Sequence, residues 1–136
     1  MNAEYYSKII EALIELIDEG VYIVDQDGVG QYYNKAMASM EKVNMDDVLG
    51  KKFHEAFPDF RMGESTMFRA LTKKEPTLKK QQTYKNLYGK EITTINSTIP
   101  IVVDGEAVAA VEVAKDITNM ESAKRFHEAI KNSKLV

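Results

Sequence analysis

The first third of the chain changes from a helical to an alternating pattern of apolar residues. Between residues 4 and 19 the apolar side chains recur three or four positions apart, with charges between them, and Gly20 follows as a stop. This pattern predicts an amphipathic helix over 4–19. Residues 21–24 and 29–33 are β-branched or aromatic, and the polar segment 25–28 between them ends in Gly28. A two-stranded hairpin is therefore predicted after the helix.

The strand pattern then disappears between residues 35 and 71. Short helices are predicted there, with Asn44 as a helix cap, Gly50 as a stop, and Pro58 and Gly63 as further breaks. Three extended segments follow over 77–87, 91–103 and 106–115. Turns at 88–89 and at 104–105 separate them, the second being an Asp-Gly hairpin signal.

The last segment has a helical pattern again. Thr118 and Glu121 have the spacing of a capping box, which predicts a helix start at this point. The apolar stripe of that helix would consist of Met120, Ala123, Phe126 and Ile130.

Together these elements predict an α+β fold. A five-stranded antiparallel sheet with short helices over one face, plus an amphipathic helix at each end, satisfies the order. We expect a terminal helix over 1–19, a core domain over 20–118, and the start of a linker or signalling helix over 119–136. At 136 residues the chain has the size of one domain.

Composition removes several classes of function. The chain has no Cys, which excludes disulfides, thiolate metal sites and cysteinyl-flavin photochemistry. No segment approaches the roughly 18 apolar residues of a membrane span, and we expect a cytoplasmic protein. The net charge of −3 comes from interspersed acids and bases, so direct binding of nucleic acid by this segment is not expected.

A set of short motifs, in this order and spacing, resembles the PAS family. The residues that carry the resemblance are 20–25, 27–28, 33–34, 48–51, 100–101, 104–105 and 116–118. Residues 82–86, 89–100 and 109–118 are similar to the N-terminal PAS domain of bacterial sigma-54-dependent activators, especially the arginine-utilisation regulator type. That resemblance implies a sensor followed by an ATPase and a DNA-binding domain. This sequence has no Gly-rich phosphate loop, so we expect no enzyme activity here.

Strand alternation, with the register taken from the PAS resemblance, decides which side chains face the helix-covered side of the sheet. Many of the inward residues are polar, which is costly unless hydrogen-bond partners are present. The residues expected to face inward are Tyr22, Val24, Gln82, Tyr84, Ile92, Thr94, Asn96, Thr98, Ala110, Glu112 and Ala114.

We therefore predict a pocket for a small polar metabolite such as an amino acid, since its polar groups would satisfy those of the wall. Glu112 would pair with an amine, and Arg69 with a carboxylate. Hydrogen bonds would come from Asn96, Thr94 and Thr98, and Tyr84, Gln82 and Tyr22 complete the expected site. Alternatively, the three strand residues bond one another, water or the backbones of the helices, and Glu112 faces solvent or a dimer partner.

Other ligands fit the sequence less well. The chain has two histidines, His54 and His127, and both lie in segments that favour surface positions, so haem or metal binding is not expected. Flavin photochemistry lacks both Cys and Trp, and we predict no cofactor.

Two uses of the fold remain beside ligand sensing. We expect a homodimer, and each terminal helix could be core cover, the contact surface of that dimer, or both. The first alternative is a domain without a ligand that serves only for dimerisation. The same fold could also be the sensor of a histidine kinase or of a cyclic-dinucleotide enzyme.

Overall fold

The structure, a computed structural model, describes residues 1–57, 65–86 and 88–133, so the expected breaks at Pro58 and Gly63 lie outside the described residues. Its elements are α1 (Ala3–Leu16), β1 (Gly20–Asp25), β2 (Gly30–Tyr33), α2 (Lys35–Glu41), the 3-10 turn η1 (Met45–Asp47), α3 (Phe53–Ala56), α4 (Thr66–Lys73), β3 (Thr77–Lys85), β4 (Glu91–Val103), β5 (Glu106–Asp116) and α5 (Thr118–Asn132).

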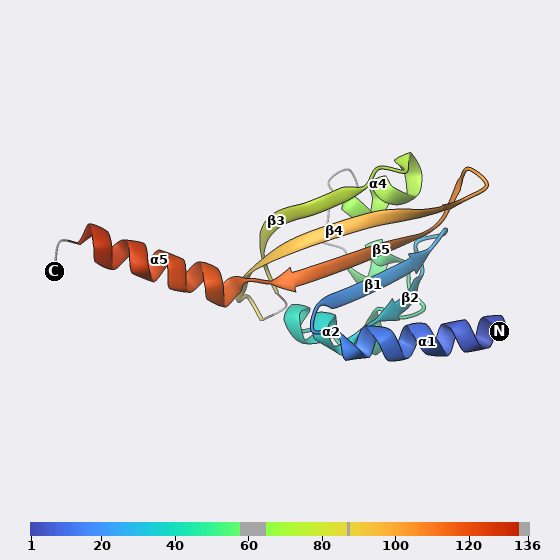
Figure 1. Ribbon diagram of the computed structural model, residues 1–136, viewed down its shortest axis with the longest axis horizontal. Coiled ribbons are helices and arrows are strands. Elements are labelled where there is room, and N and C mark those ends of the chain that lie inside the picture. The colour runs from blue at the N-terminus through green and yellow to red at the C-terminus, as the bar shows by residue number, and fades with distance from the viewer. Residues whose placement is uncertain (58–64, 87, 134–136) are drawn as a thin grey trace.

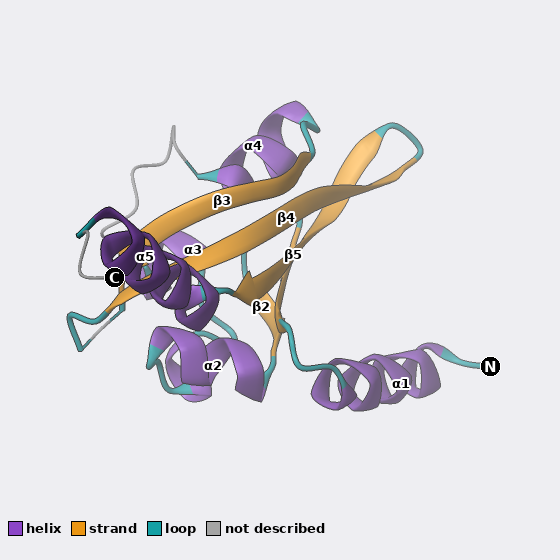
Figure 2. Cartoon of the chain, turned by 60° about the vertical axis from the view of Figure 1, so that its left-hand side comes forward, coloured by secondary structure: helices purple, strands orange, loops and turns teal. Residues whose placement is uncertain are grey.

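The five strands form one antiparallel sheet in the order β2-β1-β5-β4-β3. The last strand of the chain, β5, therefore lies in the centre of the sheet. Helix α4 packs against β4 and β5, and α2 packs against β1. Figures 1 and 2 show α2, α3 and α4 on the same face of the sheet. The predicted α+β layer arrangement is confirmed.

The hydrophobic core lies between the sheet and these helices. Tyr22 and Tyr33 meet edge to face with ring centroids 5.3 Å apart, a favourable arrangement for aromatic pairs. The buried cluster consists of Tyr22, Val24, Tyr33, Met37, Met40, Val48, Met67, Ala70, Ile92, Ala110 and Ala114. No helix of the described part of the chain is long and apolar enough to cross a membrane.

The predicted end of the first helix is wrong by about one turn. Helix α1 ends at Leu16, and Ile17 is already extended. The physical cause is the buried side chain of Asn34, whose amide Nδ2 donates to the carbonyl oxygens of Ile14 at 2.7 Å and of Glu19 at 2.9 Å. Because one amide bonds both carbonyls, the chain between them must leave the helix.

Smaller differences have similar local causes. Strand β3 ends at Lys85, because the Asn86 side chain accepts hydrogen bonds from the backbone of Tyr88 and of Lys90 and starts a turn. Asn44 caps η1 as predicted, accepting from the backbone of Asp46. Gly50 follows in a turn with a φ of 77°.

The predicted capping box of the last helix is also wrong. The Thr118 hydroxyl donates to Asp116 Oδ1 at 2.6 Å, and the same oxygen accepts from the backbone of Thr118. The hydroxyl in turn accepts from the backbone N–H of Thr93 on β4 at 2.9 Å. Asp116 therefore fixes the start of α5, and Thr118 ties that start to the sheet.

Helix α5 does not cover the core. It extends away from the sheet at the C-terminal end, as Figure 1 shows. Three residues of its predicted stripe, Met120, Phe126 and Ile130, are exposed. Both terminal helices thus carry apolar residues that the described chain leaves uncovered.

Asn34 should contribute more to stability than its size suggests. Its Oδ1 also accepts from the backbone of Val21 and of Met37, so Asn34→Ala removes four hydrogen bonds inside the fold. We expect a loss of about 3 kcal/mol in the free energy of unfolding, measured by urea denaturation. Asn44→Ala, which removes one exposed cap, should cost under about 1 kcal/mol. Equal losses in the two variants would contradict this role.

Candidate functional site

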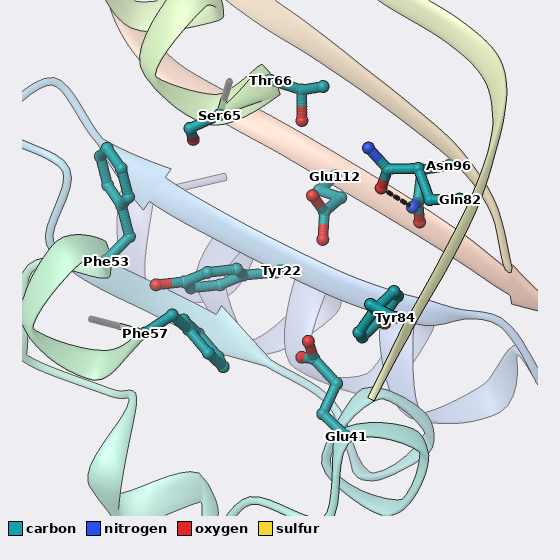
Figure 3. Close-up of a pocket in the computed structure, with 10 residues that line it drawn as sticks. All are labelled: Tyr22, Glu41, Phe53, Phe57, Ser65, Thr66, Gln82, Tyr84, Asn96 and Glu112. Carbon is teal, nitrogen blue, oxygen red and sulfur yellow. Dashed lines mark hydrogen bonds between the residues drawn. The ribbon is translucent and has the colours of Figure 1, made fainter. Parts of the chain in front are cut away.

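A cavity of about 70 Å³ lies between the sheet and the short helices, enough for a few water molecules or a small compound. Its walls come from elements far apart in the sequence, as the close-up in Figure 3 shows. The lining residues are Tyr22, Glu41, Phe53, Phe57, Ser65, Thr66, Gln82, Tyr84, Asn96 and Glu112.

Five of the eight predicted site residues lie in this lining. They are Tyr22, Gln82, Tyr84, Asn96 and Glu112, from four different strands. The alternation that predicted them holds in β3, β4 and β5 because the register shifts of these strand pairs lie outside the site residues, between Ile101 and Val102 and between Thr77 and Lys80. On β1 the shift lies between Ile23 and Val24, just after Tyr22. Their role in binding stays a prediction.

The other three predicted residues lie outside the lining. Thr94 is buried behind Asn96 and accepts a hydrogen bond from its amide at 2.9 Å. Thr98 is buried and shares a hydrogen bond of 2.9 Å with Thr66. Both threonines thus form hydrogen bonds with other side chains of the fold. This agrees in part with the alternative interpretation, in which the strand residues bond one another.

Arg69 is also absent from the lining. Helix α4 turns Met67 and Ala70 into the core, and Arg69 lies beside them with its Nε buried and without a hydrogen-bond partner. The expected pairing of Arg69 with a ligand carboxylate in this cavity is not supported by that position.

Half of the lining was missed by the sequence interpretation: Glu41, Phe53, Phe57, Ser65 and Thr66. Phe53 and Phe57 were recognisable as apolar residues one helical turn apart, but no pattern places them against Tyr22. Phe57 lies 5.9 Å from the Tyr22 ring between centroids. Glu41 ends a short helix, and only the tertiary structure turns it inward.

Glu112 is the most unusual side chain of the site. It is half-buried on the central strand β5, and among the described residues it has no hydrogen-bond or ion-pair partner. Burial raises its pKa from 4.5 to about 8, and the charge of Glu41 adds to the rise. At neutral pH the empty cavity therefore favours the protonated acid.

Glu41 is the second carboxyl group of the cavity. Burial raises its pKa from 4.5 to about 7, against the opposing effect of a hydrogen bond from Tyr33. The Tyr33 hydroxyl donates to Glu41 Oε1 at 2.5 Å. That bond holds one oxygen in place and leaves the other open to the cavity.

The remaining polar groups of the lining are donors and acceptors without charge. The Tyr22 hydroxyl is buried and has no hydrogen-bond partner within the described part of the chain. Burial, with the charges of Glu112 and Glu41, raises the pKa of Tyr22, so this phenol keeps its proton. Asn96 donates to Gln82 Oε1 at 2.5 Å as well as to Thr94, which fixes its amide across β3 and β4.

No Lys, Arg or His is among the lining residues that the structure describes. His54 and His127 are both exposed and do not belong to the lining. Within the described ranges no three acidic, His or Cys side chains are close enough to hold a metal ion. The cavity thus combines two acids, aromatic faces and neutral hydrogen-bonding groups.

Comparison with known proteins agrees with this architecture. The family described as PAS fold matches residues 14–122. Transcriptional activator RocR of Bacillus subtilis is 37% identical over 120 residues, which are 88% of this chain and 26% of that protein. The chain therefore spans about a quarter of the length of this relative.

Solved structures show the same fold at low sequence identity. The PAS domain of Bordetella pertussis BvgS has a TM-score of 0.60 and 22% identity, covering 91% of this chain and 96% of that one. An RNA-binding light-oxygen-voltage receptor has a TM-score of 0.68 and 13% identity, covering 97% of this chain and 39% of that one. At these identities the likeness concerns the fold alone.

The acid in the cavity makes a pH dependence testable. Because the folded state raises the pKa of Glu112 from 4.5, it binds more protons than the unfolded state, and stability should fall as pH rises towards about 8. Glu112→Gln, which mimics the protonated acid, should remove most of this loss. We expect the variant to gain about 2 kcal/mol over the wild type between about pH 5 and about pH 8.5, in urea titrations without ligand.

The matched control is Glu106→Gln, an exposed residue at the start of the same strand. It should leave the pH dependence of stability unchanged. An identical pH profile for wild type and Glu112→Gln would show that Glu112 does not titrate abnormally in the folded chain.

Proposed function

The chain belongs to the PAS fold family, and from this premise we propose that it is the sensory domain of a transcriptional activator and binds a small polar metabolite with an amine. The likeness to RocR, a transcriptional activator, supports the type of parent protein. The observation that supports the ligand is Glu112, a carboxyl group in a cavity wall with no partner among the described residues.

An amine would supply the interaction partner that the Glu112 carboxyl group lacks among the described residues. A buried carboxyl group without a partner is costly, and an ammonium group gives it both an opposite charge and hydrogen-bond donors. Neutral groups cannot supply the charge, and an anion would be repelled by the two acids of the wall. The polar remainder of the ligand would reach the Tyr22 hydroxyl and the carbonyl oxygen of Asn96.

The position of Glu112 also suggests how binding reaches the output. Glu112 and Asp116 lie four residues apart on β5, about 13 Å along the strand, and Asp116 fixes the start of α5. A ligand that moves the Glu112 side chain into the cavity would act on β5, the strand that leads into the start of α5. We infer that α5 relays the signal to the ATPase and DNA-binding domains that the resemblance implies, and that this segment is not itself an enzyme.

Homodimer formation is a second candidate role, favoured by α1. Its buried residue is Ile14, whereas Tyr5, Ile9, Leu13 and Leu16 form an exposed apolar stripe. These positions share one side of the helix, because they follow its period. A second copy of the chain would cover this stripe with the same stripe, as a two-fold symmetric contact does.

Binding can be tested directly on the purified chain. Thermal-shift screening of the standard amino acids and simple alkylamines, followed by calorimetric titration of any hit, should find a compound that stabilises the wild type. Glu112→Gln should weaken its binding at least about tenfold, since it removes a charge-assisted bond. Asn96→Ala should weaken it too, while Glu106→Gln should bind like the wild type. No response from the wild type, or equal affinity in Glu112→Gln, would reject the proposed site.

The dimer contact predicts a separate result. Leu13→Glu places a charge in the apolar stripe and should raise the dimer dissociation constant at least about tenfold, measured by sedimentation. Lys8→Glu, on the polar side of the same helix, is the control and should dimerise like the wild type. Because both residues are exposed, neither change should alter the fold. A monomeric wild type, or an unaffected Leu13→Glu dimer, would rule out this contact.

A further inference from the structure

The two carboxyl groups of the cavity come from opposite walls. Glu41 enters from the end of α2 and Glu112 from the middle of β5. Figure 3 shows both side chains in the cavity with their carboxyl groups turned toward one another. They are the two acidic side chains among the described lining residues, and the charge of Glu41 raises the pKa of Glu112.

Among the described residues, the ionisable groups on which both glutamates act electrostatically include three phenols. Tyr22 comes from β1, Tyr33 from β2 and Tyr84 from β3, and the charges of the two glutamates act on all three. No basic side chain belongs to the described lining. Two negative charges facing each other in this low-dielectric space would repel, so the empty cavity is expected to keep at least one proton on the pair.

Glu41 is built to take part in this arrangement. The Tyr33 hydroxyl is bonded to Oε1, which orients the carboxyl group, while Oε2 has no partner among the described residues. Tyr33 itself is 1% exposed and fixed in the core against Tyr22. The donor that holds Glu41 is therefore rigid, and the open oxygen faces the same space as Glu112.

We propose that Glu41 is a second cation-binding residue of the pocket, and that the ligand's ammonium group displaces a proton from the Glu41–Glu112 pair as it enters. This inference rests on the proposed function. It extends that function with a second charged binding residue, Glu41, and with the release of a proton on binding. The proton leaves the carboxylic acid for the solvent, the ammonium group keeps its own protons, and the two carboxylates then share one cation.

The arrangement selects an organic cation over a metal ion. Calcium takes six to eight oxygen ligands, usually several carboxylates, whereas this pair has no third acid near it within the described ranges. An ammonium group needs about three acceptors, which the two carboxylates can provide. The aromatic faces of Tyr22, Phe57 and Tyr84 line the same space and suit the alkyl part of an amine.

The test uses calorimetry on the purified chain with n-butylamine and n-pentylamine as probes, and with 1-butanol and 1-pentanol as their neutral counterparts. Titrations in phosphate and in HEPES, which differ in ionisation enthalpy and carry no primary amine, report the protons released per bound amine. We expect about one proton released near pH 7.5 for an amine that binds the wild type, and affinity that rises with pH in this range. Neutral counterparts should bind at least about tenfold more weakly.

Variants separate this inference from the proposed function. Glu41→Gln should lower amine affinity about tenfold and release fewer protons than the wild type, because burial alone still raises the pKa of Glu112, whereas Glu41→Asp, which keeps the charge, should retain the release. Glu106→Gln should behave like the wild type. An amine that binds wild type and Glu41→Gln equally, or binds without releasing a proton, would overturn the inference while leaving Glu112 as the site. If no probe or screened compound binds any variant, both proposals fail.

A ligand-free measurement provides an independent check. In urea titrations across about pH 5 to 9, the stability changes of Glu41→Gln and Glu112→Gln should not add in the double variant, because each removes the repulsion that raises the other's proton affinity. Additive effects would show that the two groups titrate independently, which contradicts a shared proton.

Discussion

One buried amide, that of Asn34, decides the geometry on which the pocket depends. Its four hydrogen bonds join the end of α1, the first residues of β1 and the first turn of α2. Since Glu41 is the last residue of that short α2, its position over the sheet follows from where the helix begins. A polar side chain with 1% exposure thus fixes both the terminal helix and one wall of the cavity.

The pocket itself follows from placing polar side chains on a concave sheet. Where a partner is within reach, the fold satisfies them: Asn96 bonds Gln82 and Thr94, and Thr98 bonds Thr66. Glu112 and the Tyr22 hydroxyl remain without such partners. A core designed for stability alone would have apolar residues at these positions, because a buried polar group without a partner lowers the free energy of unfolding. Their presence is therefore better explained by binding than by folding.

The sequence patterns predicted those parts of the structure that depend on interactions between residues close together in the sequence. The alternation of β4 and β5 gave the inward positions of Asn96 and Glu112 correctly, because the bulge of this strand pair lies beyond them at Ile101. The end of α1 was predicted wrongly, since the Asn34 side chain, distant in sequence, bonds the carbonyl oxygens of Ile14 and Glu19 and competes with the helix signal. The start of α5 was predicted at the correct residue, but its capping box was wrong, because the Thr118 hydroxyl bonds Asp116 and the backbone N–H of Thr93 instead. Glu41 could not be predicted as a lining residue, because its direction depends on the packing of α2 against β1 and on the hydroxyl of Tyr33.

The electrostatics of the cavity explain why the proposed site would prefer a cation to a neutral molecule. Protonation lowers the cost of keeping Glu41 and Glu112 buried, so the fold tolerates the pair without a ligand. The same burial strengthens the attraction to any cation that enters, since less water screens it. A neutral molecule of equal size would gain neither the charge interaction nor the release from repulsion. Burial of the two carboxyl groups destabilises the folded protein. The same burial would let the pair distinguish an amine from its neutral analogue.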